Sequence, residues 1–153
     1  MISAQHSKFA YLIAPQAIVN NAYWAGSHQH GSVNNSVDCF GYHYATINFL
    51  LGATDIAVAE LSIYESDDNS TFTQIAATDF SVAAVGTLPS ATADNTNVRF
   101  LLDLRKRKRY LRINAKNGSG STGGYATAWA ELSRAGVSPS TATERGLAQQ
   151  VIV

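Results

Sequence analysis

The sequence predicts an all-β protein, an antiparallel β-sandwich of jelly-roll type. Apolar and polar side chains alternate in several short segments, which is the pattern of half-buried strands. Clusters of short polar residues and glycine separate these segments, as they do in turns between strands. Helical periodicity is scarce along the whole chain. Many short strands joined by polar turns are typical of a jelly roll.

The first half of the chain contains two alternating segments followed by a turn. Residues 44–51 predict one strand, and residues 57–64 predict a second. Their inward faces consist of Ala45, Ile47, Phe49 and Leu51 in the first, and Ala57, Ala59, Leu61 and Ile63 in the second. The polar run 65–70 predicts a turn, because short polar side chains bond to the local backbone. Residues 71–76 are then expected to return as the partner strand.

The second half predicts three further strands. Residues 98–104 form a nearly continuous apolar run, which we expect to be buried on both sides. Residues 108–116 alternate, and so do residues 125–133. One face of the former carries Arg109, Leu111, Ile113 and Ala115; the latter turns Ala126, Ala128, Ala130 and Leu132 inward and Tyr125, Thr127, Trp129 and Glu131 outward. The Gly- and Ser-rich run 117–124 between them predicts a loop or a hairpin tip.

The 153 residues fit one structural domain with three parts. Residues 1–36 predict an N-terminal segment with one or two strands and a long loop, and residues 37–135 predict the sandwich core. Residues 136–153 predict a C-terminal arm, in which Thr141 and Glu144 match a capping box for a single helical turn. The arm closes on three apolar β-formers, which favours docking on the domain or pairing with another chain. These are Val151, Ile152 and Val153.

The sequence contains no recognisable catalytic apparatus. No nucleotide-binding or nucleophile motif occurs, and the carboxylates are scattered singly. His28 and His30 lack the partners of a metal site, and residues 67–69 lack the glycine of a calcium loop, so they predict a hairpin turn. Cys39 is the only cysteine and is expected to be a small buried hydrophobe. We therefore expect a non-enzymatic protein with no catalytic, cofactor-binding or metal-binding residues; no run is long enough for a membrane span, so no membrane partner is expected.

Charge is strongly divided along a chain whose formal net charge is zero. Eight of the eleven Lys and Arg residues lie between Arg99 and Lys116, whereas eight of the eleven acids lie between Asp38 and Asp94. Such a division favours either a polyanion-binding strip or oppositely charged surfaces that pair. Charged residues make up only 14% of the chain, below the usual ~25%, which suits a protein largely covered by its neighbours.

The basic run 105–109 is the most distinctive feature, and three explanations are open. It is a solvated hairpin tip, a nucleic-acid site with Tyr110 as a stacking residue, or a protein-contact surface that pairs with carboxylates. A pI of about 6.9 disfavours nucleic acid, because nucleic-acid-binding domains usually exceed about 9. We therefore favour protein contact and expect no direct nucleic-acid partner. The carboxylates belong to a neighbouring protein or to the acids between Asp38 and Asp94 of the chain itself.

Several segments in their order and spacing resemble a family of tailed-phage virion proteins that decorate or cement capsids. The segments that carry the resemblance are residues 37–45 (VDCFGYHYA), 50–55 (LLGATD), 63–73 (IYESDDNSTFT), 107–113 (RKRYLRI) and 144–149 (ERGLAQ). In similar proteins the position of Cys39 is often Thr, and the basic tract is often shorter.

The resemblance implies a non-enzymatic protein on the outer surface of an icosahedral head, assembled in the host cytoplasm. It implies two partners: the major capsid protein, whose adjacent copies it cements, and further copies of itself, commonly as a homotrimer. On this hypothesis the interface residues are Arg105, Lys106, Arg107, Lys108 and Arg109, with Trp24, Val151, Ile152 and Val153 as apolar anchors. Trp24 fits an exposed interface position or the core equally well.

Two other functions remain open from the sequence. A carbohydrate-binding sandwich of a phage tail or baseplate would recognise a host glycan, with Tyr64, Tyr125 and Trp129 as a stacking platform for sugar rings. A nucleic-acid-binding protein would lose affinity steeply as salt is raised.

Overall fold

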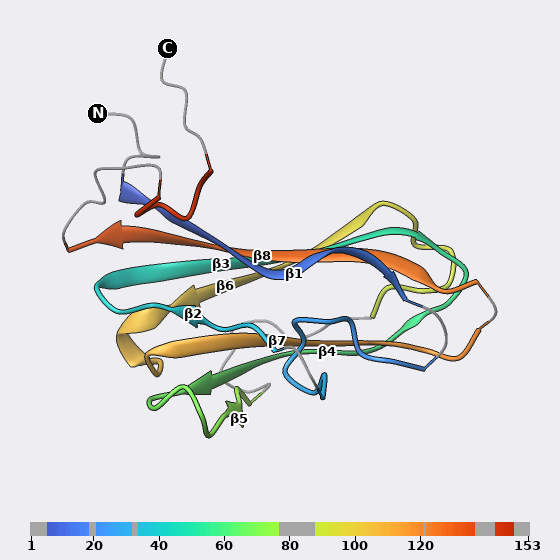
Figure 1. The fold of residues 1–153 in the computed structure, drawn as a ribbon, viewed down its shortest axis with the longest axis horizontal. Helices are drawn as coiled ribbons and strands as arrows, with labels where there is room; N and C mark the ends of the chain where they lie inside the picture. Colours follow the sequence, from blue (N-terminus) through green and yellow to red (C-terminus); the bar gives the residue numbers. More distant parts are fainter. Residues whose placement is uncertain are drawn as a thin grey trace, which may run out of the picture.

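Eight strands form two four-stranded antiparallel sheets that face each other (Figure 1). The computed structural model describes residues 6–18, 21–31, 34–76, 88–120, 122–136 and 143–148. The strands are β1 (Lys8–Ile18), β2 (Val37–Asp38), β3 (Tyr42–Thr54), β4 (Val58–Ser66), β5 (Thr73–Gln74), β6 (Thr96–Asp103), β7 (Tyr110–Asn117) and β8 (Gly124–Ala135), and the 3-10 turn η3 (Leu104–Lys106) follows β6. The first sheet has the order β1-β8-β3-β6 and the second the order β2-β7-β4-β5.

The strand order confirms the predicted jelly roll. Each strand of the first half of the chain pairs with the strand that has the matching position counted from the end of the chain. The antiparallel pairs are β1 with β8, β2 with β7, β3 with β6 and β4 with β5. Each such pair lies within one sheet, and successive pairs alternate between the two sheets. This is a long hairpin wound around a barrel-like core, the arrangement of double-sheet jelly rolls.

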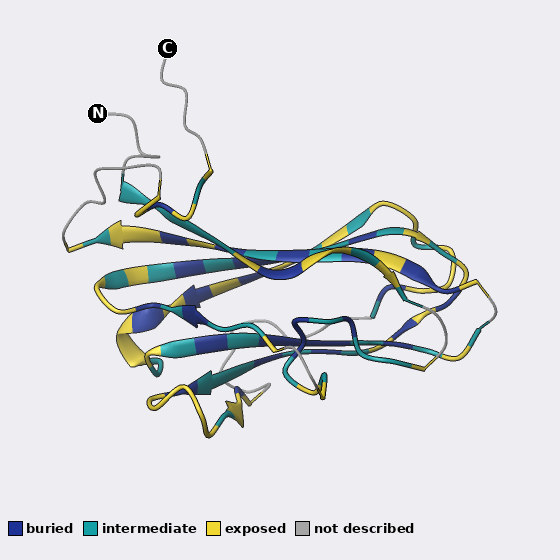
Figure 2. Ribbon diagram, viewed as in Figure 1, coloured by how far each residue is buried: buried dark blue, intermediate teal, exposed yellow. Residues whose placement is uncertain are grey.

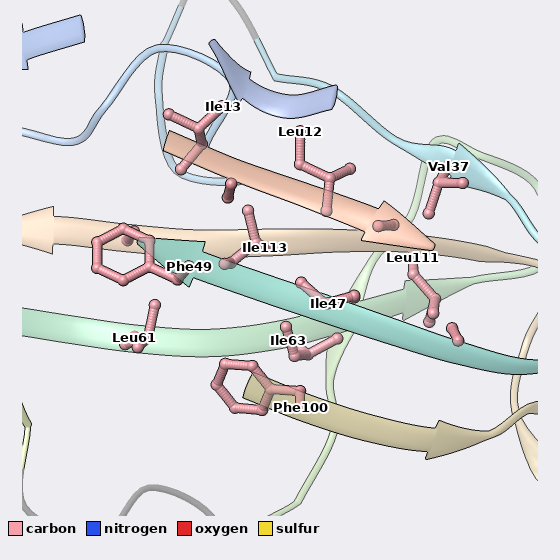
Figure 3. Packing of buried hydrophobic residues seen from close by; sticks show 14 of the residues in the cluster. Leu12, Ile13, Val37, Ile47, Phe49, Leu61, Ile63, Phe100, Leu111 and Ile113 are labelled. Atoms are coloured by element: carbon pink, nitrogen blue, oxygen red, sulfur yellow. The ribbon is translucent and has the colours of Figure 1, made fainter. Parts of the chain in front are cut away.

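The core fills the space between the sheets, as the dark stripes of Figure 2 show. Side chains from both sheets point toward one another there (Figure 3), among them Ile47 and Phe49 of β3 and Leu111 and Ile113 of β7. All four are fully buried, or nearly so. Removing that apolar surface from water is the main stabilising term of such a sandwich. The alternation predicted for residues 44–51 and 125–133 is therefore confirmed, and so is that of residues 110–116; Arg109, expected on the same face as Leu111, lies before β7 and is exposed.

Two strand predictions need correction. At the start of β4, Val58 is buried, whereas Ala59 and the preceding Ala57 are exposed, because a bulge between Val58 and Glu60 shifts the pairing with β7 by one residue. From Leu61 onward the predicted phase holds. Strand β6 is buried on one side only, since it lies at the edge of the first sheet and Leu101 is 71% exposed.

The N-terminal segment contributes one described strand and a structured loop. β1 forms one edge of the first sheet, and the Asn35 side chain donates to the Leu12 carbonyl at 2.9 Å. Residues 21–30 of the β1–β2 loop instead extend the second sheet along β7. There the His28 amide donates to the Ile113 carbonyl at 2.8 Å, and the Asn117 amide donates to the Ala22 carbonyl at 2.9 Å. The β1–β2 loop thus contacts β1 through Asn35 and forms backbone hydrogen bonds with β7.

The described part of the C-terminal arm is a turn beside β1. The Phe9 amide donates to the Arg145 carbonyl, and the Gly146 amide donates to the Thr143 carbonyl at 2.9 Å. Thr141 of the expected capping box lies outside the described residues. Over the described ranges, no helix has the length and apolar character needed to cross a membrane.

Candidate binding surface at the basic end of the sandwich

Three loops meet at one end of the sandwich, on the left in Figure 1. They are the β2–β3 turn around Cys39, the β4–β5 hairpin and the β6–β7 connection, which carries the chain from the first sheet to the second. The basic run 105–109 forms most of that connection. Its five positive residues therefore lie near the ends of β2 and β4, which supply the acids Asp38 and Glu65.

Arg109 forms the most regular ion pair of this end, with Asp38. Its Nε lies 2.9 Å from Asp38 Oδ1 and its Nη2 lies 2.8 Å from Oδ2, a bidentate geometry. The pairing of β2 with β7 sets Asp38 opposite Tyr110, so the neighbouring Arg109 reaches it. The guanidinium hydrogen bond lowers the pKa of Asp38 below its usual range, and the same contact raises the pKa of Arg109.

Arg107 and Lys108 are tied to the β4–β5 hairpin. Arg107 Nη1 lies 3.6 Å from Glu65 Oε1, and both side chains are mostly buried. The Lys108 amide donates to Glu65 Oε2 at 3.2 Å, and Lys108 Nζ lies 3.5 Å from the Thr73 hydroxyl. Glu65 therefore links the connection between the sheets to the hairpin.

Arg105 and Lys106 are exposed at the outermost part of the connection. Asp103 accepts from the Arg105 amide at 3.1 Å and forms an ion pair with the Arg105 guanidinium, which caps η3. These hydrogen bonds lower the pKa of Asp103 to about 2. The Arg105 side chain is 62% exposed despite this pair, so it stays available to a partner.

Aromatic rings accompany the arginines. The Arg109 guanidinium lies 5.0 Å from the ring centres of both Phe40 and Tyr110, and those of Arg105 and Arg134 lie 5.8 and 5.2 Å from Tyr44. Phe40 is 75% exposed. Arginines held in place by acids and aromatic rings suit planar recognition of carboxylates on another protein.

The structure thus gathers all five residues of the basic run at one surface. Arg105, Lys106 and Arg109 are exposed there, whereas Arg107 and Lys108 are half-buried and contact the hairpin. Two of the carboxylates that pair with this run, Asp38 and Glu65, belong to the chain itself. This was one of the two sources of carboxylates that the divided charge of the sequence allowed.

Two groups of expected apolar anchors have different outcomes. Trp24 is fully buried, and its ring packs edge-on against Phe49 at 5.6 Å between centroids. Of its two sequence-based interpretations the core is right and the exposed anchor is wrong, because the β1–β2 loop runs alongside β7, where the Trp24 amide donates to the Ala115 carbonyl at 3.3 Å. Val151, Ile152 and Val153 lie outside the described residues.

The three-residue sugar platform does not form. Tyr125 and Trp129 point outward from the first sheet, whereas Tyr64 points outward from the second, where it stacks on His28 at 4.0 Å. The sequence does not show that β4 and β8 belong to different sheets, so their outward side chains were expected on one surface.

The remaining sequence-based predictions concern polar residues. Cys39 is buried as expected, and burial raises the pKa of its thiol to about 12. Asp68 accepts from the Ser66 hydroxyl and from the Ser70 and Thr71 amides, which confirms a hairpin turn. Among the residues that the structure describes, no three His, Cys, Asp or Glu side chains gather as metal ligands.

Sequence reasoning missed one surface, the outer face of the first sheet. There Phe9 and Tyr11 of β1 join Trp129 of β8, and Phe9 lies 5.1 Å from Tyr11 and 6.3 Å from Trp129 between ring centroids. Trp129 was expected outward, but the bulges of β1 hide the alternation that would have marked Phe9 and Tyr11.

A scan against protein-family models and a search of curated proteins each found no match.

Proposed function

We propose that this chain is a non-enzymatic structural protein of a tailed-phage virion, bound to the outside of the icosahedral head and cementing adjacent major capsid proteins. The observation that carries the proposal is a convergence at the basic end. Residues 37–45, 63–73 and 107–113, which carry much of the resemblance to decoration proteins, are far apart in sequence but contact one another there through Asp38–Arg109 and Glu65–Arg107. A shared set of segments that builds one surface supports a shared binding function.

The physical properties of this surface fit attachment to a protein. Arg105, Lys106 and Arg109 are exposed, and the Arg109 guanidinium lies beside the exposed Phe40 ring, so the surface combines positive charge with an apolar ring. Acidic side chains of the capsid protein would pair with those arginines. Copies attached as trimers over local threefold axes, as the resemblance implies, would add their individual contacts into a large total stabilisation.

The first test is the copy number in purified virions, measured by quantitative mass spectrometry. We expect the chain at a level comparable with the major capsid protein, because a cement protein covers the whole head. A few copies per particle would contradict the proposal and point to the tail, where the glycan-binding alternative belongs.

The second test measures binding of the purified chain to heads that lack it. We expect Lys106→Glu to weaken binding at least about tenfold at low salt, since it places like charges in contact with capsid carboxylates. Ala91→Glu, in the exposed turn before β6 at the other end of the sandwich, is the control and should bind as the wild type does. Equal binding by both folded variants would remove the basic end from the interface.

A further inference from the structure

The outer face of the first sheet is more apolar than a solvent-facing sheet requires. Tyr11, Leu101 and Tyr125 project from it on β1, β6 and β8 and are 61%, 71% and 59% exposed. They are three of the four large apolar side chains that stand exposed in the described part of the chain. Phe9 and Trp129 stack between β1 and β8 on the same face. Apolar patches of this kind usually mark an interaction surface.

Two charged residues of this face, Arg99 and Glu131, lie on opposite sides of β3, and a third, Asp103 of β6, lies opposite Tyr44 and pairs with Arg105. Arg99 lies on β6 opposite Asn48, and Glu131 lies on β8 opposite Thr46, two residues further along β3. Arg99 and Glu131 are both exposed. Within the described ranges, neither has an ion pair with an acid or a base, although both lie on a folded sheet.

Arg99 is held in place on this face. Its Nε donates to Asn48 Oδ1 at 2.8 Å, and Asn48 is only 1% exposed although it lies on the outer side of β3. This contact uses Nε, so the two Nη nitrogens can donate to a carboxylate. The arginine is thus prepared for an acid that the described part of its own face does not supply.

We propose that a second copy of this chain packs on the outer face of the first sheet, with Arg99 of each copy against Glu131 of the other. A two-fold axis lying in the contact and passing across β3 exchanges the two positions, so both ion pairs form together. Such an isologous contact is the usual way in which identical chains pair. The apolar side chains of β1, β6 and β8 are then removed from water around the ion pairs.

The size of the face fits a reversible dimer. Four strands of about eight residues cover roughly 20 by 27 Å, or about 500 Å² per copy. The total of about 1,000 Å² is near the lower limit for a specific interface. Association is therefore expected to depend on concentration. The contact centres on Arg99 and Glu131 and adjoins the basic end at Tyr44, whose ring lies near Arg105 and Arg134.

Sedimentation equilibrium of the purified full chain over a concentration series tests the inference. We expect the mass of two chains, or of six if trimers also form. Arg99→Glu and Glu131→Arg should each weaken self-association at least about tenfold, and the double variant, which exchanges the charges, should restore most of it. A chain that stays monomeric up to about 1 mM, or forms only trimers, would overturn the proposal. So would a double variant no better than the single ones.

A second pair of variants keeps the test independent of the Arg99–Asn48 bond. Leu101→Ser and Phe40→Ser each remove one highly exposed apolar side chain, the first from the proposed contact and the second from the basic end. Only Leu101→Ser should weaken self-association. Binding of host polysaccharide that Leu101→Ser abolishes in a monomeric chain would instead assign the face to a glycan. Because these measurements use the isolated chain, their outcome does not depend on attachment to the head.

Discussion

At the scale of single residues, His28 shows how a loop side chain becomes part of the second sheet. Its ring stacks on Tyr64 at 4.0 Å and lies 5.6 Å from Phe72, while the Arg112 guanidinium lies 3.8 Å from the centre of the Phe72 ring. Burial, followed by the nearby positive charge of Arg112, lowers the pKa of His28 below its ordinary value of 6.5. The neutral imidazole is therefore the form that fits the folded protein.

This arrangement predicts that stability falls in mild acid. The unfolded chain takes up the His28 proton near pH 6.5, before the folded protein does, so stability is full above that pH and decreases as the pH falls below it. Urea unfolding between pH 7.5 and 5 should show the decrease in the wild type, and His28→Gln should reduce its slope. An identical slope in the two proteins would show that His28 does not titrate on unfolding.

At the scale of elements, bulges explain where the alternation of the sequence misleads. The bulge in β4 exchanges the inward and outward positions of Ala57, Val58 and Ala59, and the bulges of β1 let the consecutive residues Leu12 and Ile13 both be buried. The periodic patterns of β3, β7 and β8 persist through most of each strand. Those strands were therefore predictable from local sequence, and β1 was not.

The β1–β2 loop depends on a glycine that local sequence does not distinguish from its neighbours. Gly26 has φ +101°, and a Cβ there would lie 2.0 Å from the Leu12 carbonyl oxygen. Gly31, in the same loop, has open space around it. We expect Gly26→Ala to lower the free energy of unfolding by about 1–3 kcal/mol, since the backbone must shift or strain.

Gly31→Ala is the matched control for this prediction. It should leave stability within about 0.5 kcal/mol of the wild type. Chemical denaturation of both variants measures the difference. Equal stabilities would mean that the loop adapts to a side chain at Gly26 without loss.

At the scale of the whole molecule, the divided charge is partly resolved within the chain. Acids of β2 and β4 meet the basic connection between β6 and β7, because the jelly-roll winding brings these elements to one end. Glu65 is the central acceptor, and its side chain is only 14% exposed.

Glu65→Gln tests the contribution of this link between the two sheets. It weakens the contacts of Arg107 and of the Lys108 amide, so we expect a loss of about 1–3 kcal/mol in the free energy of unfolding. Asp67→Asn, in the exposed turn two residues away, removes the same charge and should cost much less. If thermal or urea unfolding shows similar losses for both, net charge rather than the specific contact is responsible.

The sequence by itself determined the fold class, the main strands, the β4–β5 turn and the basic run, because alternation, turn residues and charge are local properties. The tertiary structure alone decided which segments share a surface. It set the acids Asp38 and Glu65 against the basic run, buried Trp24, placed Tyr64 and Trp129 on opposite faces, and assembled the outer face of the first sheet. Each of these depends on how strands that are distant in sequence pair and pack. The local pattern of residues predicts a strand but not the strand with which it pairs.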